Sequence, residues 1–235
     1  MSNKKEIIIK ATKLKKSFIT GDTEQTIFEN LDLNIYRGDF TVIMGSSGAG
    51  KSTLMYSLSG MDRPSSGEVV WNDKTITSLS DDRLAIFRRK NCGFVFQQIY
   101  LLDKMSLMDN VLTASALSGA SKKDSVKYAK ELFELVNIPE ITRKKFPSQV
   151  SGGEAQRAGI VRAVINKPEI LFADEPTGNL DSFNTHEIMG LLEEINERGT
   201  TVIVVTHSHE MVQQMKKRVI TMDRGVVVKD EGGSR

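Results

Sequence analysis

Apolar residues in this chain form short runs near both ends and a longer-period pattern in the middle. Runs bounded by turn residues predict strands at residues 7–9, 40–44, 68–71, 93–96, 169–173 and 201–205, and Leu31, Leu33 and Ile35 alternate as in a half-buried strand. From about Leu101 to Asn166 the period becomes helical. After a Ser121-x-x-Asp124 capping signal, one apolar face contains Val126, Ala129, Leu132, Phe133 and Val136.

Strands and helices alternate again after residue 169, which favours a parallel sheet. A helix predicted from Ser182 to Arg198, ending at Gly199, separates the strands at 169–173 and 201–205. Runs at 218–222 and 226–229 predict a final hairpin. We interpret residues 1–235 as one α/β domain, with a core at about 1–98 and 167–235 and an inserted helical lobe at about 99–166.

Composition narrows the possible partners. The 235 residues include 39% hydrophobic residues, enough for a core, and the net charge of +2 argues against nucleic acid as the main partner. The short basic clusters are Lys122-Lys123, Arg143-Lys144-Lys145 and Lys216-Lys217-Arg218. They are expected on solvated faces, and the alternative is that one of them lies near acidic lipid head groups. The single cysteine, Cys92, excludes an internal disulfide and is expected to be a small core residue. No apolar run reaches the length of a membrane span, so a membrane role requires a separate chain.

The segment at residues 45–52 matches G-x-x-x-x-G-K-[ST] at every fixed position. Its residues are Gly45, Ser46, Ser47, Gly48, Ala49, Gly50, Lys51 and Ser52. Main-chain amides of such a loop bind phosphates, the lysine reaches the terminal phosphates, and the hydroxyl binds Mg²⁺. The alternative is a plain Gly-rich turn. The apolar strand before the loop, and the helix that begins with Ser52 and Thr53, favour ATP binding with Mg²⁺.

Two further strands are predicted to end in chemically useful residues. The run 170–173 leads to Asp174 and Glu175. Asp174 would bind Mg²⁺ and Glu175 would polarise the attacking water. The alternative is an acidic turn before Pro176. The run 201–205 leads to His207, within reach of a γ-phosphate. For His207, an ordinary loop histidine or a zinc pair with His209 are the alternatives.

A fourth motif is Ser151-Gly152-Gly153-Glu154 at the start of a helix that runs to about Asn166. The spacing predicts a capping box, in which Ser151 and Glu154 cap each other's main-chain amides. The two glycines also leave amides uncovered, which suits a second anion site. The spacing alone does not decide between these roles.

Together these motifs, with Gln97, residues 150–157 and residues 173–181, closely resemble the ATPase subunit of ABC transporters over nearly the whole chain. The resemblance implies a P-loop NTPase fold with an N-terminal antiparallel β part. It also implies that Gln97 contacts Mg²⁺ and senses the membrane subunit, and that Asp181 links two ATP sites. Phe18 occupies the place of the adenine-stacking aromatic, although a plain core position is the alternative.

The resemblance further implies a homodimer in which Ser151 and Gly153 contact the γ-phosphate bound by the other subunit. Val150 and Ala155 depart from the usual residues of this motif, but neither removes a phosphate contact. The expected partner is an integral membrane permease on a separate chain, which would place this subunit peripherally on the cytoplasmic face of the cell membrane.

Residues 177–181 and the region 21–26 resemble the branch that contains macrolide exporters, lipoprotein-release ATPases, bacitracin-type peptide-resistance modules and a cell-division ATPase. This implies export of, or resistance to, antibiotics or antimicrobial peptides, or lipoprotein release. A signalling ATPase that controls cell-wall enzymes through a membrane partner is an alternative. A soluble ABC-type ATPase acting on DNA or ribosomes is disfavoured, because Lys51 and Asp174 are joined by a compact segment without long heptads.

Overall fold

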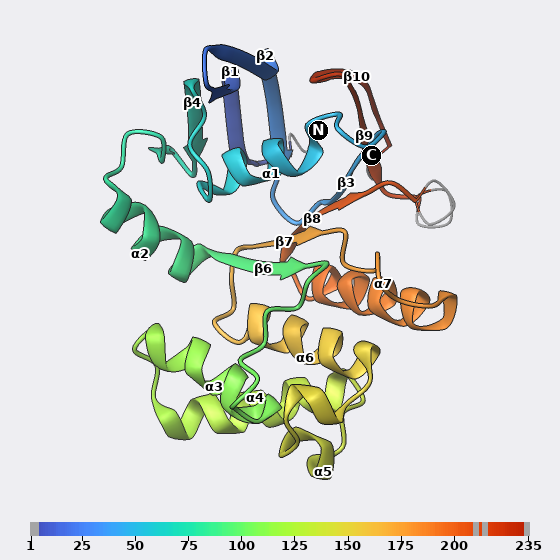
Figure 1. Ribbon diagram of the computed structural model, residues 1–235. Coiled ribbons are helices and arrows are strands. Elements are labelled where there is room, and N and C mark those ends of the chain that lie inside the picture. Colours follow the sequence, from blue (N-terminus) through green and yellow to red (C-terminus); the bar gives the residue numbers. More distant parts are fainter. Residues whose placement is uncertain (1–4, 209–211, 213–215, 233–235) are drawn as a thin grey trace. The chain divides into compact units, whose positions relative to one another are not determined.

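The structure is a computed structural model that describes residues 5–208, 212 and 216–232. The chain forms two compact units, one made of residues 1–88 and 201–235 and the other of residues 89–200 (Figure 1). Each unit contains both strands and helices.

The first unit contains an antiparallel sheet in the order β2-β1-β4-β5. Its strands are β1 (Ile7–Thr20), β2 (Thr23–Tyr36), β4 (Ser66–Trp71) and β5 (Lys74–Thr75). The long β1–β2 hairpin turns at residues 21–22, and Ile8, Ile9, Ala11 and Leu14 of β1 are buried. The indole of Trp71 is anchored by a hydrogen bond from Nε1 to the Leu58 carbonyl at 2.9 Å.

The same unit holds four strands of mixed direction, in the order β10-β9-β3-β8. They are β3 (Phe40–Met44), β8 (Thr201–Thr206), β9 (Arg218–Asp223) and β10 (Val226–Glu231). β3 runs parallel to β8 and β9, whereas β10 is antiparallel to β9. All residues of β3 and β8 are buried, as expected for parallel strands covered on both faces. Two helices begin in this unit, α1 (Lys51–Ser59) and α2 (Asp81–Asn91).

The second unit joins a parallel strand pair to a group of packed helices. The strands are β6 (Cys92–Phe96) and β7 (Ile170–Asp174). The helices are α3 (Leu107–Leu117), α4 (Lys122–Leu135), α5 (Glu140–Arg143), the 3-10 turn η1 (Pro147–Gln149), α6 (Gly152–Val164) and α7 (Ser182–Glu197). Helix α6 contacts α3, α4, α7 and β6, so it lies at the centre of this unit.

The predicted fold class is confirmed: an α/β protein with an antiparallel β part, parallel strands in the core and a helical segment. Most predicted elements lie within a residue or two of their observed positions, but the strands predicted at 7–9 and from Leu31 to Ile35 are only parts of the longer β1 and β2. Ser121 precedes α4 as predicted, although its side chain makes no cap hydrogen bond. The helix at Asp81–Asn91 is not predicted from the sequence, because Leu84 is its only buried residue and the helical period is correspondingly weak.

Three expectations about individual side chains are wrong. Arg143 and Arg218, predicted on solvated faces, are buried, because each guanidinium finds a main-chain carbonyl and an aromatic ring: Ile138 and Phe133 for Arg143, and the distant Asn34 and Tyr36 for Arg218. Arg218 forms a bidentate ion pair with Asp230 at 2.7 and 2.8 Å, which counters the cost of its burial and raises the guanidinium pKa. Cys92 is half-buried rather than a core residue, since it begins β6.

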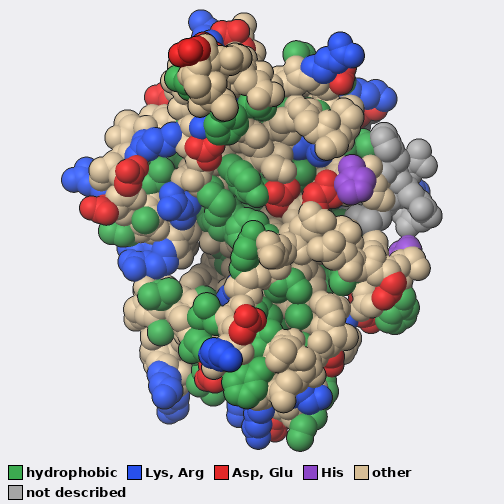
Figure 2. All heavy atoms as spheres, in the orientation of Figure 1, with side chains coloured by type: hydrophobic (Ala, Val, Ile, Leu, Met, Phe, Trp, Pro, Cys, Tyr) green, Lys and Arg blue, Asp and Glu red, His purple; other side chains and the backbone are tan. Residues whose placement is uncertain are grey.

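The remaining basic side chains form no single patch on the face drawn in Figure 2, where blue side chains lie scattered among red and green ones. Within residues 5–208, 212 and 216–232, no helix combines the length and the apolar character that crossing a membrane requires.

Candidate functional site

The loop between β3 and α1 has the main-chain shape that its glycines predict. Gly45, Gly48 and Gly50 have φ values of 152°, 78° and 94°, which other L-residues rarely adopt. Gly50 is the N-cap of α1 and has no side chain, and the first turn of this fully described helix contains no acidic residue. The main-chain amides of the helix N-terminus therefore present partial positive charge to an anion.

Three segments distant in the sequence hold this loop in place. A Cβ atom on Gly45 would lie 2.2 Å from the Met222 carbonyl oxygen of β9, and one on Gly50 would lie 2.9 Å from Cγ2 of Ile27 in β2. The Gly225 amide, in the β9–β10 turn, donates to the Ala49 carbonyl at 3.1 Å. The loop is thus held by protein contacts as well as by its own backbone preferences.

Lys51 is 7% exposed and lies against the loop. Its Nζ donates to the Ser46 carbonyl at 2.9 Å, which keeps the ammonium group over the loop that Ser46, Ser47 and Gly48 form at the surface. The hydroxyl-bearing residues Ser52 and Thr53 follow at the start of α1 and are half-buried. The loop therefore combines a fixed cation, main-chain amides and hydroxyl groups within one turn of chain.

His207 lies at the same edge of the first unit as the loop. Met44 and Thr206 are paired in the parallel register of β3 and β8, so Gly45 and His207 each follow directly on neighbouring strand ends. His207 is exposed, and the Ser208 amide donates to Thr206 Oγ1 at 3.1 Å, which fixes the turn. His209, the partner in the zinc alternative, lies outside the described residues. Among those that are described, no three His, Cys, Asp or Glu side chains group as metal ligands.

Phe18 is a surface residue of β1, which excludes the core alternative. Its side chain is 43% exposed, and Lys16 Nζ lies 4.8 Å from the ring centroid. Lys16 Nζ in turn donates to Asp62 Oδ1 at 2.8 Å and to the Arg63 carbonyl at 2.7 Å. The cation supports the ring by a cation–π contact and leaves part of the ring open to solvent.

In the second unit, the predicted acids lie at the carboxyl end of β7. Phe96 pairs with Asp174, so Gln97 and Glu175 follow directly on two neighbouring strand ends. Asp174 is buried and Glu175 half-buried. Glu175 has a φ of 46°, and non-glycine residues adopt this conformation at a cost of about 1–3 kcal/mol when the surroundings enforce it. The Gly178 amide donates to the Glu175 carbonyl at 3.1 Å and closes the turn.

Gln97 packs on this same turn. Its Nε2 lies 3.4 Å from Asn179 Oδ1, and a Cβ atom on Gly178 would approach Nε2 to 2.7 Å. Gly178 therefore leaves the space that the Gln97 side chain occupies.

The capping box at the start of α6 is confirmed. Ser151 Oγ accepts from the Glu154 amide at 3.2 Å, and the Ser151 amide donates to Glu154 Oε2 at 2.8 Å. This amide hydrogen bond lowers the pKa of Glu154 below its ordinary value of 4.5. Ser151 and Gly152 are exposed and Gly153 is buried, so the first two residues of the motif face solvent in this chain.

Asp181 is the N-cap of α7. Its carboxylate accepts from the Asn184 amide at 2.8 Å and from Asn184 Nδ2 at 2.7 Å, which lowers the Asp181 pKa. Asn184 also lies against α6, because a Cβ atom on Gly153 would come within 2.1 Å of Asn184 Oδ1. Asn184 is not among the predicted site residues, although a polar residue at the third position after an N-cap aspartate is a signal for it in the sequence.

The predicted residues are thus divided between the units. The loop at 45–53, Phe18 and His207 belong to the first unit, whereas Gln97, Asp174, Glu175, Ser151 to Gly153 and Asp181 belong to the second. Within each unit the predicted residues cluster at strand ends or helix starts.

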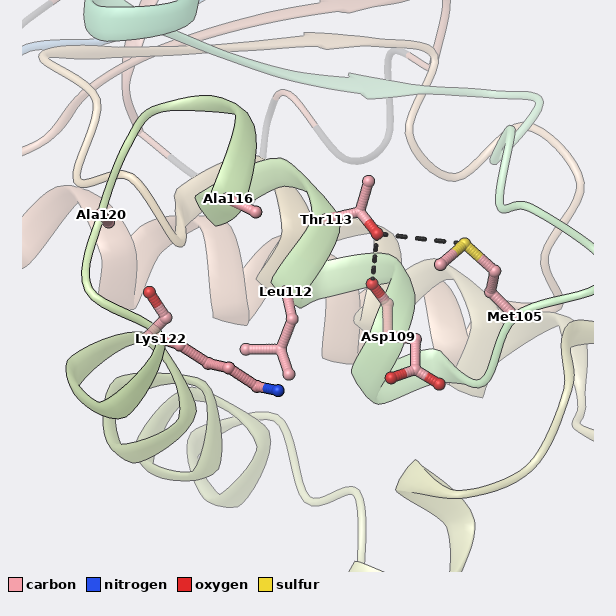
Figure 3. A pocket seen from close by; sticks show the side chains of 8 residues that line it. Met105, Asp109, Leu112, Thr113, Ala116, Ala120 and Lys122 are labelled. Carbon is pink, nitrogen blue, oxygen red and sulfur yellow. Dashed lines mark hydrogen bonds between the residues drawn. The ribbon is translucent and has the colours of Figure 1, made fainter.

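The second unit also has a pocket of about 330 Å³ between α3 and α4 (Figure 3). Its lining is largely apolar, and Thr113 Oγ1 donates to the Asp109 carbonyl at 2.8 Å within it. Only Asp109 and Lys122 of the eight lining residues are charged.

The strand, glycine loop and helix of the first unit define a P-loop protein of the α/β class. The family model of ABC transporters matches residues 28–178. The chain therefore belongs to the ABC transporter family, as one of its ATPase domains.

Individual relatives place the chain in the macrolide-export and lipoprotein-release branch. It is 44% identical to the macrolide export ATP-binding/permease protein MacB of Bdellovibrio bacteriovorus over 93% of this chain and 33% of that protein. It is 37% identical to the lipoprotein-releasing system ATP-binding protein LolD of Idiomarina loihiensis over 97% of this chain and 99% of that protein. The chain thus spans about a third of the MacB relative.

A solved structure of the ATP-binding cassette MJ0796, described as a dimeric post-hydrolysis state bound to ADP and Pi, has the same fold. The TM-score is 0.88 at 35% identity, covering 97% of this chain and 99% of that one.

Proposed function

We propose that the chain binds and hydrolyses ATP as the ATPase subunit of an ABC transporter. The observation that carries the proposal is the loop at 45–50, whose positive φ values, helix N-terminus and buried Lys51 suit a polyphosphate. Family membership and the ADP and Pi reported for the MJ0796 cassette support the same function.

Each site residue has a role that suits its chemistry. Lys51 binds the β- and γ-phosphates, Phe18 stacks on adenine, and His207 contacts the γ-phosphate. Glu175 polarises the attacking water, and its enforced backbone conformation directs the carboxylate. The amides of Gly45 to Gly50 stabilise the charge on the phosphates.

Mg²⁺ prefers oxygen donors, so the Ser52 hydroxyl, the Asp174 carboxylate and the Gln97 carboxamide oxygen are proposed as donors of a magnesium site. The ion would neutralise phosphate charge there.

We propose that two copies assemble as a homodimer around two ATP molecules. Ser151 and Gly153 of each copy contact the γ-phosphate held by the other, and Asp181 links the two sites. The exposure of Ser151 and Gly152 supports this arrangement, because it leaves the start of the motif open to a second copy. The solved MJ0796 cassette is dimeric.

The partner is proposed to be an integral membrane permease, with this subunit on the cytoplasmic face of the membrane. The MacB relative carries a permease in its name, and LolD belongs to a lipoprotein-releasing system. The proposed transport function is the export of antibiotics or antimicrobial peptides, or lipoprotein release. Stimulation of ATPase activity by the permease and a peptide would separate transport from signalling.

The test of hydrolysis compares the parent with Glu175→Gln and with the control Glu197→Gln, which alters an exposed residue of α7. General-base catalysis contributes about 10²–10⁴ in rate, so Glu175→Gln is expected to lower turnover by that factor, keep ATP binding and accumulate ATP-dependent dimers on size exclusion. Turnover of Glu175→Gln close to the parent rate refutes the role of Glu175. Full-rate hydrolysis by a strict monomer refutes the dimer.

A further inference from the structure

The carboxamide of Gln156 connects helix α6 to the ends of both strands of the second unit. Gln156 is 2% exposed, and its Nε2 donates to the Phe96 carbonyl at 3.2 Å and to the Pro176 carbonyl at 2.8 Å. One amide group therefore satisfies two main-chain acceptors that are 80 residues apart along the chain.

These two carbonyls adjoin the residues to which the proposed function assigns the water and the metal. Phe96 precedes Gln97, and Pro176 follows Glu175. Proline has no amide hydrogen, so the main chain after Glu175 cannot be fixed by a donor at residue 176. The hydrogen bond to the Pro176 carbonyl and the one from Gly178 to the Glu175 carbonyl therefore fix the main chain at and directly after Glu175, the residue with the φ of 46°.

The other end of the connection is the start of α6. Ser151 caps this helix, and Gln156 lies five residues further along, or about 7.5 Å at 1.5 Å per residue. Because the intervening turn is hydrogen-bonded helix, it offers a rigid connection from Ser151 to Gln156 and from there to both strand ends.

We propose that Gln156 is a positioning residue for ATP hydrolysis, which holds Gln97 and Glu175 in register with the start of α6. The inference rests on the proposed function, in which Ser151 contacts the partner's nucleotide while Gln97 and Glu175 act at the nucleotide of their own chain. Gln156 then makes the catalytic geometry of one site depend on the contact made at the other.

The experiment measures turnover, affinity for a fluorescent ATP analogue and melting temperature for the parent, Gln156→Leu, Gln156→Glu and a control, Asn166→Leu. Asn166 also uses a carboxamide for two hydrogen bonds in this unit, to the Ala114 carbonyl at 3.1 Å and from Ser118 Oγ at 3.0 Å, but neither contact involves the ends of β6 or β7. All rates are measured about 15 °C below the lowest melting temperature, so that every variant is folded during the assay.

Misplacing catalytic groups by about 1 Å costs on the order of 10²-fold in rate. Gln156→Leu is therefore expected to lower turnover by about 10- to 100-fold with less than a threefold change in ATP affinity, whereas Asn166→Leu keeps turnover within about threefold. Gln156→Met replaces Gln156→Leu if the latter does not fold.

The pH profile of Gln156→Glu gives a second readout. The buried carboxyl group faces two carbonyl oxygens, which favours its protonated form, and the protonated form regains one donor. Its turnover relative to the parent should rise as the pH falls from 8.5 to 6.0, while the ratio for Gln156→Leu stays flat.

Turnover of folded Gln156→Leu within threefold of the parent, an equal loss in Asn166→Leu, or a flat profile for Gln156→Glu each overturns the inference. An inactive parent, or an undiminished Glu175→Gln, refutes instead the proposed function on which the inference rests.

Discussion

The contact between the β9–β10 turn and the P-loop gives a sharp prediction for Gly225→Ala. Gly225 has a φ of 79°, and its amide donates to the Ala49 carbonyl at 3.1 Å. An added Cβ would lie 1.9 Å from the Ile27 carbonyl oxygen and 3.0 Å from the Phe28 Cα. Both are main-chain atoms, so no side-chain rotation relieves the overlap, and the turn must move away from β2.

The cost has three parts. A left-handed conformation costs an alanine about 1–2 kcal/mol. Non-bonded atoms settle at about 3.5 Å, so the turn must shift by more than about 1 Å, which breaks the Gly225–Ala49 hydrogen bond at a further cost of about 0.5–1.5 kcal/mol. With some strain left in β2, Gly225→Ala should lower the free energy of unfolding by about 2–4 kcal/mol, or the melting temperature by roughly 5–12 °C.

The matched control is Gly38→Ala. Gly38 has a φ of 72°, but a Cβ added there would have no neighbouring atom within 4 Å, so this change costs only the conformational term of about 1–2 kcal/mol. The assay is thermal unfolding together with titration of a fluorescent ATP analogue. Because the P-loop moves in one variant only, ATP affinity should fall about tenfold, or about 1.4 kcal/mol, in Gly225→Ala and stay unchanged in Gly38→Ala.

Equal melting shifts in the two variants would show that the overlap with Ile27 is relieved without cost. An unchanged ATP affinity in Gly225→Ala would refute the claim that the turn supports the loop.

Three further predictions concern single side chains. Lys51→Ala should weaken binding of the ATP analogue by roughly 10- to 150-fold, because a charge-assisted contact contributes about 1.5–3 kcal/mol; an unchanged dissociation constant contradicts the role of Lys51. The lowered pKa of Glu154 means that its capping carboxylate stabilises the fold above pH 4.5 and that this contribution is lost as the pH falls through the depressed value. Urea unfolding between pH 6 and pH 3 should therefore show a smaller acid loss in Glu154→Gln than in the parent, and parallel losses would refute the coupling. Arg143→Leu removes the donor to the Ile138 carbonyl at 2.8 Å and should cost about 1–3 kcal/mol in unfolding free energy, whereas the exposed Lys144→Met should stay within about 0.5 kcal/mol.

Features that depend on neighbouring residues were predictable from the sequence. The strand, loop and helix around Lys51, the capping box at Ser151 and the hairpin turn before Val226 each have their determinants within a few residues. These motifs indicate both the backbone conformation and the chemistry of their residues, so the fold class and the residues of the candidate site could be predicted together.

Features that depend on distant partners could not be predicted. Arg218 looks like one more basic surface residue until Asp230 and the Asn34 carbonyl, 184 residues away, are brought to it. The contacts of Met222 with Gly45 and of Gln156 with Phe96 have the same origin. No local pattern distinguishes these side chains from solvated ones, because the information lies in which elements become neighbours.

Three motif glycines are closely packed before any nucleotide is considered, Gly45 against main chain and Gly153 and Gly178 against the ends of side chains. An added Cβ would meet Met222 O at 2.2 Å from Gly45, Asn184 Oδ1 at 2.1 Å from Gly153, and Gln97 Nε2 at 2.7 Å from Gly178. Substitutions at these positions disturb packing inside the unit, so a loss of activity does not by itself report a contact with ATP.

Gly152 is the position at which packing and ligand contact separate. The nearest atom to an added Cβ is Leu180 Cδ2 at 3.8 Å, an ordinary contact, and alanine is favoured over glycine in a helix by about 1 kcal/mol. Gly152→Ala should therefore fold at least as well as the parent, whereas Gly153→Ala must displace Asn184. If the start of α6 packs on the partner's nucleotide, Gly152→Ala should still lose ATP-dependent dimerisation and turnover. If Gly152→Ala is stable and fully active, the partner's nucleotide does not pack on the start of α6. The added methyl group requires no rearrangement within the chain, so such a rearrangement could not account for the retained activity.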